Sequence, residues 1–249
     1  MASPIAWRLA TITAVTPETP TVRSFTLSIP DWGGHRAGQH VDLRLTAADG
    51  YSVERSYSIA SEPERAGQIE LTVERIADGE VSSFLHDIAV PGDRIEVRGP
   101  IGGYFVWEAT GPMAADPLFL VAGGSGVVPL MAMLRHRARA GVGNPTRLLF
   151  SSRHLEEVIY RDELDQLAAA GDGLSVVHTL TRSQPPGWTG FARRIDDAMI
   201  AEVLGPLGSG ARSFACGPTA LVEVAANALV RLGLPADRVR TERFGPTGT

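Results

Sequence analysis

The sequence predicts two domains: a six-stranded antiparallel β-barrel over residues 1–112, then a doubly wound parallel-sheet α/β domain over residues 113–249. Up to about Val106 the apolar segments are short, rich in Val, Ile, Thr and Leu, and separated by Gly, Pro or Asp. This pattern is typical of strands joined by tight turns. From residue 118 onward, strand-like segments alternate with longer helix-like ones, which indicates a parallel sheet covered by helices.

The first domain shows the alternation expected of strands that pack one face on a core. Apolar and polar residues alternate over 41–45 and again over 69–74. The segments predicted as strands are Arg23–Ile29, Gln39–Leu45, Arg55–Ile59, Ile69–Ile76 and Arg94–Arg98. A short helix is expected at Val81–Asp87, and Pro91-Gly92-Asp93 turns the chain into the last strand. Frequent turns and alternation together indicate a small antiparallel barrel.

The second domain begins after a turn-prone linker, Gly111–Pro117. Leu118–Ala122 is wholly apolar, as expected for a strand buried on both faces. Helices and strands then alternate. The predicted helices are Val128–Ala140, Arg161–Ala170, Ile195–Leu204 and Thr219–Leu232. The predicted strands between and after them are Thr146–Ser151, Leu174–Leu180, Ser213–Cys216 and Val239–Phe244.

The composition is that of a soluble globular protein, with 44% hydrophobic and 20% charged residues. A formal net charge of -5 argues against non-specific nucleic-acid binding, which needs a basic face. The N-terminus lacks the apolar core of a signal peptide, and no stretch approaches the roughly 18 apolar residues of a membrane span. We therefore expect a cytoplasmic protein that binds neither nucleic acid nor membrane.

Several residue types are scarce or missing, and this excludes some kinds of site. Cys216 is the one cysteine, which rules out a disulfide within the chain and a cysteine-ligated iron–sulfur cluster built from this chain alone. The six histidines show no zinc-ligand spacing, and no metal site is expected. Every basic residue is arginine, so a P-loop and Schiff-base chemistry are excluded. Such uniform use of arginine lowers the weight of any single Arg as an anion ligand.

Two motifs suited to anion binding occur in a fixed order. Arg55-Ser56-Tyr57-Ser58 offers a guanidinium, an aromatic ring and a hydroxyl on one strand, which suits a flavin and its pyrophosphate. Gly123–Pro129 is a glycine-rich turn that opens a helix, where backbone N–H groups favour a dinucleotide phosphate. Each alone also fits ordinary structure, an exposed Arg beside a half-buried Tyr or a tight strand-to-helix connection. Together they indicate electron transfer between a nicotinamide and a flavin.

Five short segments, in order, resemble the ferredoxin–NADP reductase family of flavoproteins. They are Arg55–Ser61, Gly79–Ser82, Gly99–Gly102, Gly123–Pro129 and Cys216–Pro218. The similarity runs from Gly38-Gln39 to Glu242 and implies that the barrel binds FAD and the second domain binds NADPH or NADH. FAD is expected rather than FMN because the pyrophosphate-binding pattern is complete.

On this resemblance, Arg55 pairs with the flavin pyrophosphate, Tyr57 stacks on the isoalloxazine, and Ser58 bonds near its N5. The start of the helix at Gly79–Ser82 holds the second phosphate, and Arg75 lies near the adenosine half. The residues assigned to the flavin are Arg55, Ser56, Tyr57, Ser58, Val73, Arg75, Gly79, Val81, Ser82 and Phe244. For Phe244 two roles stay open, shielding the flavin ring or packing in the core, and the tail after it has an open role as a cover for the site.

The same resemblance assigns residues to the nicotinamide nucleotide: Gly124, Ser125, Gly126, Pro129, Ser152, Arg153, Arg161, Cys216, Gly217 and Pro218. No acidic residue stands at 151–153 to bond a free ribose 2′-hydroxyl, which favours NADPH while NADH stays open. The residues assigned to catalysis are Ser58, Cys216 and Glu242. The thiol is expected beside the nicotinamide, and the carboxylate is expected to relay a proton with Ser58.

These assignments predict a reductase that passes hydride from NADPH to bound FAD and then single electrons to a separate redox protein, a ferredoxin or an oxygenase component. Such a partner would dock near the flavin edge, with Arg23, Arg36 and Arg44 as candidate contacts. Two alternatives remain: a reductase of free flavin or of a small-molecule acceptor, and a non-catalytic flavin-binding subunit of a larger complex. We expect a monomer.

Overall fold

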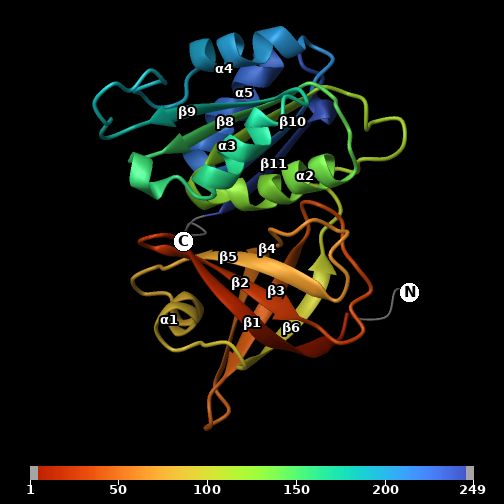
Figure 1. The fold of residues 1–249 in the computed structure, drawn as a ribbon, viewed down its shortest axis with the longest axis vertical. Coiled ribbons are helices and arrows are strands. Elements are labelled where there is room, and N and C mark those ends of the chain that lie inside the picture. Colours follow the sequence, from red (N-terminus) through yellow and green to blue (C-terminus); the bar gives the residue numbers. More distant parts are fainter. Residues whose placement is uncertain (1–4, 245–249) are drawn as a thin grey trace.

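The computed structural model describes residues 5–244. The chain forms a six-stranded antiparallel sheet curled into a barrel and a five-stranded parallel sheet flanked by helices, one above the other in Figure 1. This confirms the predicted fold class. Within residues 5–244, no helix combines the length and the apolar character that crossing a membrane requires.

The barrel strands follow the order β4-β3-β6-β1-β2-β5. They are β1 (Trp7–Thr19), β2 (Val22–Ser28), β3 (His40–Thr46), β4 (Ser52–Ser58), β5 (Gln68–Glu74) and β6 (Arg94–Ile101), with α1 (Glu80–Asp87) after β5. The predicted alternation is present, since Val41 and Leu43 of β3 are buried. The outer strands β4 and β5 are joined by one bridge between Ile59, directly after β4, and Leu71 within β5.

β1 is the strand that the sequence did not reveal. Its 13 residues include Pro17, and its pairing with β2 shifts register twice, between Ile12 and Ala14 and again between Pro17 and Thr19. β6 pairs with β1 only over Trp7–Thr11. At Pro17, therefore, β1 is paired with β2 on one side and, among residues 5–244, with no strand on the other. A proline, which lacks the N–H donor, is tolerated there.

The parallel sheet has the order β11-β10-β7-β8-β9. Its strands are β7 (Leu118–Gly123), β8 (Thr146–Ser152), β9 (Leu174–Leu180), β10 (Arg212–Pro218) and β11 (Val239–Phe244). The helices are α2 (Val127–Arg139), α3 (Arg161–Ala169), α4 (Asp197–Leu204) and α5 (Thr219–Arg231). The strand order reverses at β7, and the crevice at such a point is where open α/β sheets bind ligands.

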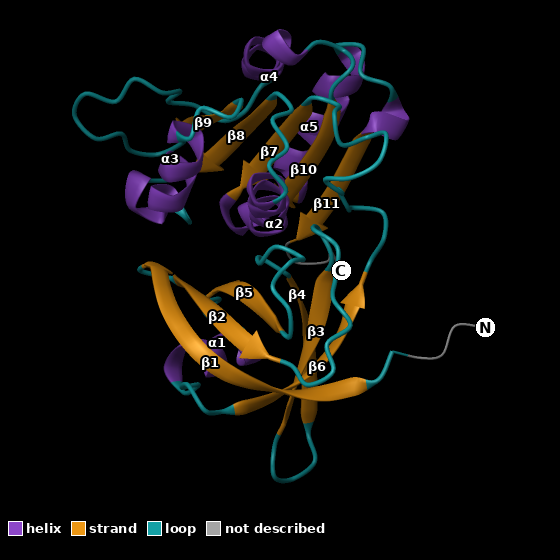
Figure 2. Cartoon of the chain, turned by 45° about the vertical axis from the view of Figure 1, so that its right-hand side comes forward, coloured by secondary structure: helices purple, strands orange, loops and turns teal. Residues whose placement is uncertain are grey.

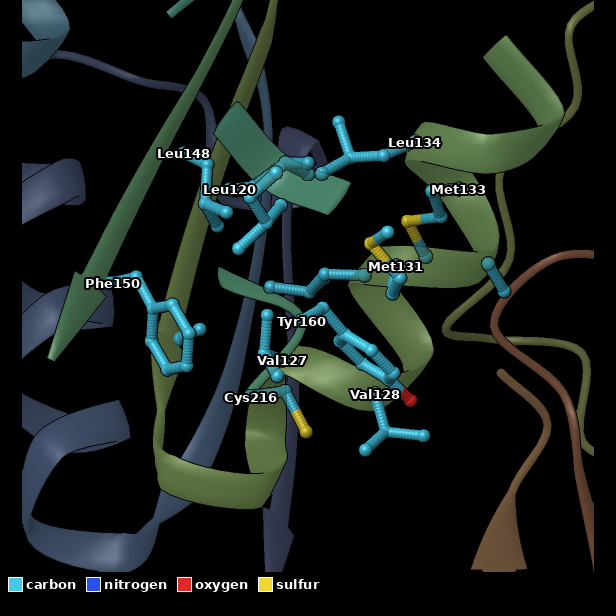
Figure 3. Close-up of a cluster of buried hydrophobic side chains, with 14 of the residues drawn as sticks. Leu120, Val127, Val128, Met131, Met133, Leu134, Leu148, Phe150, Tyr160 and Cys216 are labelled. Atoms are coloured by element: carbon cyan, nitrogen blue, oxygen red, sulfur yellow. The ribbon is translucent and has the colours of Figure 1, made fainter. Parts of the chain in front are cut away.

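The central strand β7 is buried on both faces, as its sequence predicted. Leu118 and Leu120 pack with residues of α2 and α3, whereas Phe119 and Val121 pack with residues of α4 and α5. Figure 3 shows the first of these layers, in which Leu120, Leu148 and Phe150 face the side chains of α2. The site therefore stands on a sheet held by a core on each side.

A polar contact joins the two sheets. Arg135 of α2 donates to the carbonyl oxygen of Ala60 over 3.0 Å, to Glu70 of β5 over 2.6 Å and to Glu163 of α3 over 2.7 Å. The Tyr160 hydroxyl donates to Thr72 of β5. Removing one partner of a buried ion pair costs about 3–5 kcal/mol because the other charge is left unpaired, so a substitution of Arg135 would weaken the contact between barrel and α/β domain.

Candidate functional site

A cleft of about 390 Å³ lies where the carboxyl ends of the parallel strands face the barrel. Figure 2 shows the strands of the α/β sheet pointing toward the barrel, which brings the ends of β7 and β10 to this cleft. Seven of the predicted site residues line it: Arg75, Gly124, Ser125, Ser152, Arg153, Pro218 and Phe244.

Below the cleft, the backbone of the turn after β7 touches the backbone at the end of β10. Gly124–Gly126 forms a 3-10 turn between β7 and α2. A Cβ on Gly126 would lie 2.1 Å from the carbonyl oxygen of Cys216, and one on Gly217 would lie 3.0 Å from the amide nitrogen of Gly123. Only glycine permits this approach, and Gly217 also has a positive φ of 152°. Pro129, in the first turn of α2, has the fixed φ that a helix start accepts.

This turn leaves hydrogen-bond donors at the cleft. Among residues 5–244, no side chain caps the N-terminus of α2. The Val127 amide is used within the turn, where it donates to the carbonyl oxygens of Gly124 and Ser125, so the anion-binding arrangement consists of the preceding amides of the Gly124–Gly126 turn and the positive end of the helix dipole. Ser125 donates its hydroxyl across the cleft to Oε2 of Glu74, at the end of β5, over 2.9 Å.

Ser152, at the end of β8, carries a polar group without a partner. Its side chain is 6% exposed, and its hydroxyl makes no hydrogen bond within the described part of the chain. Buried hydroxyls are normally hydrogen-bonded, so this hydroxyl is available to a ligand bound in the cleft. Arg153 is exposed beside it, and the two residues fit a ribose that carries a phosphate.

Arg161 lies apart from the other predicted nucleotide residues. It opens α3 and lines a neighbouring hollow of about 270 Å³ with Leu155, Glu156 and Ser183. The cleft that holds Ser152 and Arg153 does not include it.

Cys216 and Glu242 stand side by side on the parallel strands β10 and β11. One carboxylate oxygen of Glu242 is buried and has no partner among residues 5–244, and burial raises the pKa of this carboxyl to about 7. Cys216 is 1% exposed, and burial, with a further contribution from Glu242, raises the pKa of its thiol well above the ordinary value. The thiol is therefore protonated and weakly nucleophilic, whereas the carboxyl exchanges a proton near neutral pH.

The predicted flavin residues of β4 face solvent or bond to local partners. Arg55 is exposed and donates to the carbonyl oxygen of Glu54 over 2.7 Å. Ser56 donates to Asp42 over 2.6 Å. Tyr57 and Ser58 are half-buried, and burial raises the pKa of Tyr57 to about 12, so its phenol stays neutral. These four residues follow the barrel wall and do not line the cleft.

The predicted flavin residues after β4 lie in three different places: the cleft, the barrel core and the start of α1. Arg75 lines the cleft and makes two hydrogen bonds to Asp87, of 3.1 and 2.7 Å. Val73 and Val81 are buried in the barrel core. Ser82 donates to the carbonyl oxygen of Gly79 over 3.1 Å and accepts from the amide of Ile76 over 3.2 Å, so its hydroxyl is used within the turn that precedes α1. Gly79 is the N-cap residue of α1.

Phe244 is 37% exposed and lines the cleft, so it does not pack in the core. The tail at residues 245–249, which had an open role as a cover for the site, lies outside the described residues. Sequence reasoning missed Glu74 and Thr181, which also line the cleft. Thr181 follows the end of β9, and the rule that ligands bind at carboxyl ends of parallel strands could have identified it.

The three candidate docking arginines already have partners. Arg23 donates to the carbonyl oxygen of His86 over 2.7 Å, and Arg36 pairs loosely with Glu108 at 3.8 Å. Arg44 makes two hydrogen bonds to Glu96, and its guanidinium lies 4.2 Å from the ring centroid of Trp7. Arg44 therefore belongs to a charge network on the barrel surface.

Two family models match the chain: an oxidoreductase FAD-binding domain over residues 7–106, and an oxidoreductase NAD-binding domain over residues 120–227. Ferredoxin–NADP reductase B of Sorangium cellulosum is 35% identical over 94% of this chain and 96% of its own length. The reductase component of phenol 2-monooxygenase from a Pseudomonas species is 29% identical over 94% of this chain and 64% of its own length.

A solved structure supports the fold. The FAD/NAD-binding domain of nitric oxide dioxygenase from Vibrio cholerae superposes with a TM-score of 0.84, at 23% identity, over 96% of this chain and 99% of that domain. The family-model matches and the Sorangium relative together identify the two halves as FAD-binding and nicotinamide-nucleotide-binding. The chain belongs to the ferredoxin–NADP reductase family of flavoprotein oxidoreductases.

Proposed function

We propose that this oxidoreductase takes hydride equivalents from NADPH and passes single electrons from bound FAD to a separate redox protein, a ferredoxin or an oxygenase component. The observation that carries the proposal is the cleft itself. It is lined by Glu74 and Arg75 at the end of β5 in the barrel, by Gly124 and Ser125 of the glycine turn, and by Phe244, two residues after Glu242 on β11. Electron transfer needs both cofactors at one such junction.

FAD, when bound, supplies the step between two-electron and one-electron chemistry, and the chain supplies binding and orientation. In the proposal, Arg55 exchanges its bond to the Glu54 carbonyl oxygen for a charge-assisted bond to the flavin pyrophosphate. The half-buried ring of Tyr57 offers a stacking face, and the amides at the start of α1, beginning at Gly79, receive the second phosphate.

For the nucleotide, the proposal assigns the diphosphate to the amides of the Gly124–Gly126 turn and to the Ser125 hydroxyl. It assigns the adenosine ribose to Ser152, whose orphan hydroxyl then gains a partner. Arg153 next to it supports NADPH over NADH, because a guanidinium binds a 2′-phosphate well and no carboxylate is present there for a free 2′-hydroxyl.

The roles proposed for Glu242 and Cys216 at the reaction centre follow from the protonation states of the carboxyl and the thiol. The Glu242 carboxyl, with a pKa of about 7, holds or releases a proton at neutral pH, as a relay group needs to do. Cys216 stays a neutral thiol and serves as an apolar contact that excludes water. Ser58, at the end of β4, is the proposed hydrogen-bond partner on the flavin side.

A separate acceptor is supported by the phenol 2-monooxygenase relative, which is named as a reductase component. The test is NADPH-driven reduction of cytochrome c, with and without an added ferredoxin. We expect slow reduction by the protein alone and an increase of at least about tenfold with ferredoxin. Rapid reduction by the protein alone, unaffected by ferredoxin, contradicts a dedicated protein acceptor. Loss of flavin on gel filtration together with rapid reduction of added free flavin points instead to a free-flavin reductase.

A further inference from the structure

A carboxylate of the barrel reaches the phosphate-binding turn of the other sheet. Glu74 is the last residue of β5, and its Oε2 accepts the Ser125 hydroxyl bond over 2.9 Å. Both residues line the same cleft of about 390 Å³. The contact joins the two halves directly at the position where the proposed function puts the nucleotide diphosphate.

The charge of Glu74 is not neutralised by the arginine next to it in sequence. Arg75 turns to Asp87 and forms an ion pair with it through two hydrogen bonds, of 3.1 and 2.7 Å. A hydrogen bond to an ionised acceptor is stronger than one between neutral groups, so Ser125 is well satisfied by Glu74. A ligand at the turn therefore has to displace a good acceptor.

A nucleotide diphosphate brings negative charge to the same hydroxyl. Glu74 then loses its bond to Ser125 and lies beside an anion of like sign. The same cleft is lined by Ser152, whose buried hydroxyl has no partner among residues 5–244, so a nucleotide that bonds Ser152 would lie in the cleft that Ser125 and Glu74 also line.

We propose that Glu74 is an internal competitor for the nucleotide diphosphate at Ser125. In the free protein Glu74 accepts the hydrogen bond of Ser125. It thereby lowers the affinity for both the reduced and the oxidised nucleotide, so that the oxidised product dissociates readily. This inference rests on the proposed function, since it takes the Gly124–Gly126 turn as the diphosphate site.

The test compares Glu74→Gln with the FAD-loaded wild-type protein, using the perturbation of the flavin spectrum to measure the Kd of NADP⁺ in 20 mM and 500 mM salt. Glutamine keeps the shape and an acceptor oxygen but removes the charge. We expect the variant to bind NADP⁺ about 3- to 10-fold more tightly at low salt, because like charges a few ångströms apart repel in water. The difference shrinks at high salt, where such charges are screened.

Two further variants make the result specific. Glu74→Ala removes both charge and acceptor and is expected to tighten binding in the same direction. Glu202→Gln, an exposed residue on α4, removes one negative charge away from the cleft and is expected to leave the Kd unchanged. The FAD content and flavin spectrum of each variant report that the barrel is intact.

The outcomes separate this inference from the function on which it rests. Unchanged binding in Glu74→Gln, or tightening matched by Glu202→Gln, overturns the inference while the reductase function stands. Weaker binding in Glu74→Gln also overturns it and makes Glu74 an acceptor for a ribose hydroxyl. If the wild-type protein binds neither NADP⁺ nor NAD⁺, the proposed function itself fails.

Discussion

The two cofactor sides of the molecule are built differently. On the nucleotide side the cleft floor is made of backbone, with Gly126 and Gly217 pressed against the neighbouring turn. On the flavin side the predicted ligands are surface side chains with internal partners, as in the bonds from Arg55 to Glu54 and from Ser56 to Asp42. The backbone of the nucleotide side is therefore fixed by the fold, whereas the side chains predicted to bind the flavin would have to exchange their internal bonds for bonds to it.

This difference shows which substitutions are informative. The close-packed backbone at Gly126 and Gly217, called the cradle below, tolerates little change in shape, because packed interiors respond to the addition of even one methyl group. A side-chain site loses the contribution of the group removed, and the scaffold beneath it stays in place. The predictions below use the contrast, beginning with the largest expected effect.

The cradle is tested by Gly126→Ala. The added Cβ meets the carbonyl oxygen of Cys216 at 2.1 Å, so the turn moves away from β10. A displacement of about 1 Å can cost on the order of 100-fold in rate, and we expect a loss of that size in flavin reduction by NADPH with FAD content unchanged. Stopped-flow flavin bleaching measures it. Gly143→Ala is the control, since its Cβ meets only an ordinary 3.7 Å contact; a wild-type rate in Gly126→Ala would show that the turn is not rigid.

The side-chain site is tested by Arg55→Leu. Loss of a hydrogen bond to a charged group costs about 1.5–3 kcal/mol, so the Kd for FAD is expected to rise about 10- to 100-fold. Titration of the apoprotein with FAD, followed by fluorescence quenching, measures this. Arg94→Leu, an exposed arginine at the start of β6, is the matched control. Equal FAD affinity in the Arg55 variant and the control would remove Arg55 from the site.

The buried carboxyl is tested by the pH dependence of stability. Burial raises the pKa of Glu242 to about 7, above its ordinary value, so the folded state binds this proton more tightly than the unfolded state. The contribution is fully present below the unfolded pKa and is lost as pH rises through about 7, by about 2–3 kcal/mol. Urea unfolding at pH 5 and pH 8.5 should show this loss in the wild-type protein and not in Glu242→Gln. The same pH dependence in both proteins would contradict a buried, titrating Glu242.

The coenzyme preference is tested by Arg153→Ser. Removal of an exposed guanidinium beside a phosphate is expected to raise the KM for NADPH about tenfold and to leave the KM for NADH unchanged. Steady-state assays with both nucleotides measure the ratio. Arg194→Ser serves as the matched surface control. A parallel rise in both KM values would mean that Arg153 does not distinguish NADPH from NADH through the 2′-phosphate.

The fold was predictable because periodicity is local. The wholly apolar β7 and the alternating β3 could be recognised from their own residues. β1 could not, because the pairing that makes Pro17 acceptable depends on where β6 ends. An element could therefore not be predicted from sequence where its formation depends on contacts between segments that are distant in sequence.

A segment could be recognised from sequence where a motif carried its own backbone geometry, as in the Gly123–Pro129 turn, whose first three residues line the cleft. Glu74 was missed because its importance depends on Ser125, which reaches it from the other sheet. The separation of Arg161 from the cleft was also hidden, since it depends on the left-handed conformation of Tyr160 and the path of the chain into α3. The pairing of Arg44 with Glu96 likewise requires β3 and β6 to be neighbours.

The measurement to make first is an anaerobic titration of the purified protein with NADPH and then NADH, following the visible absorbance of the flavin. We predict rapid bleaching by NADPH and slower bleaching by NADH, because the proposed function brings both cofactors together between the barrel and the α/β sheet and assigns the 2′-phosphate to Arg153. A flavin that is present and bleached by neither nucleotide would contradict hydride transfer and leave a flavin-binding protein without reductase activity.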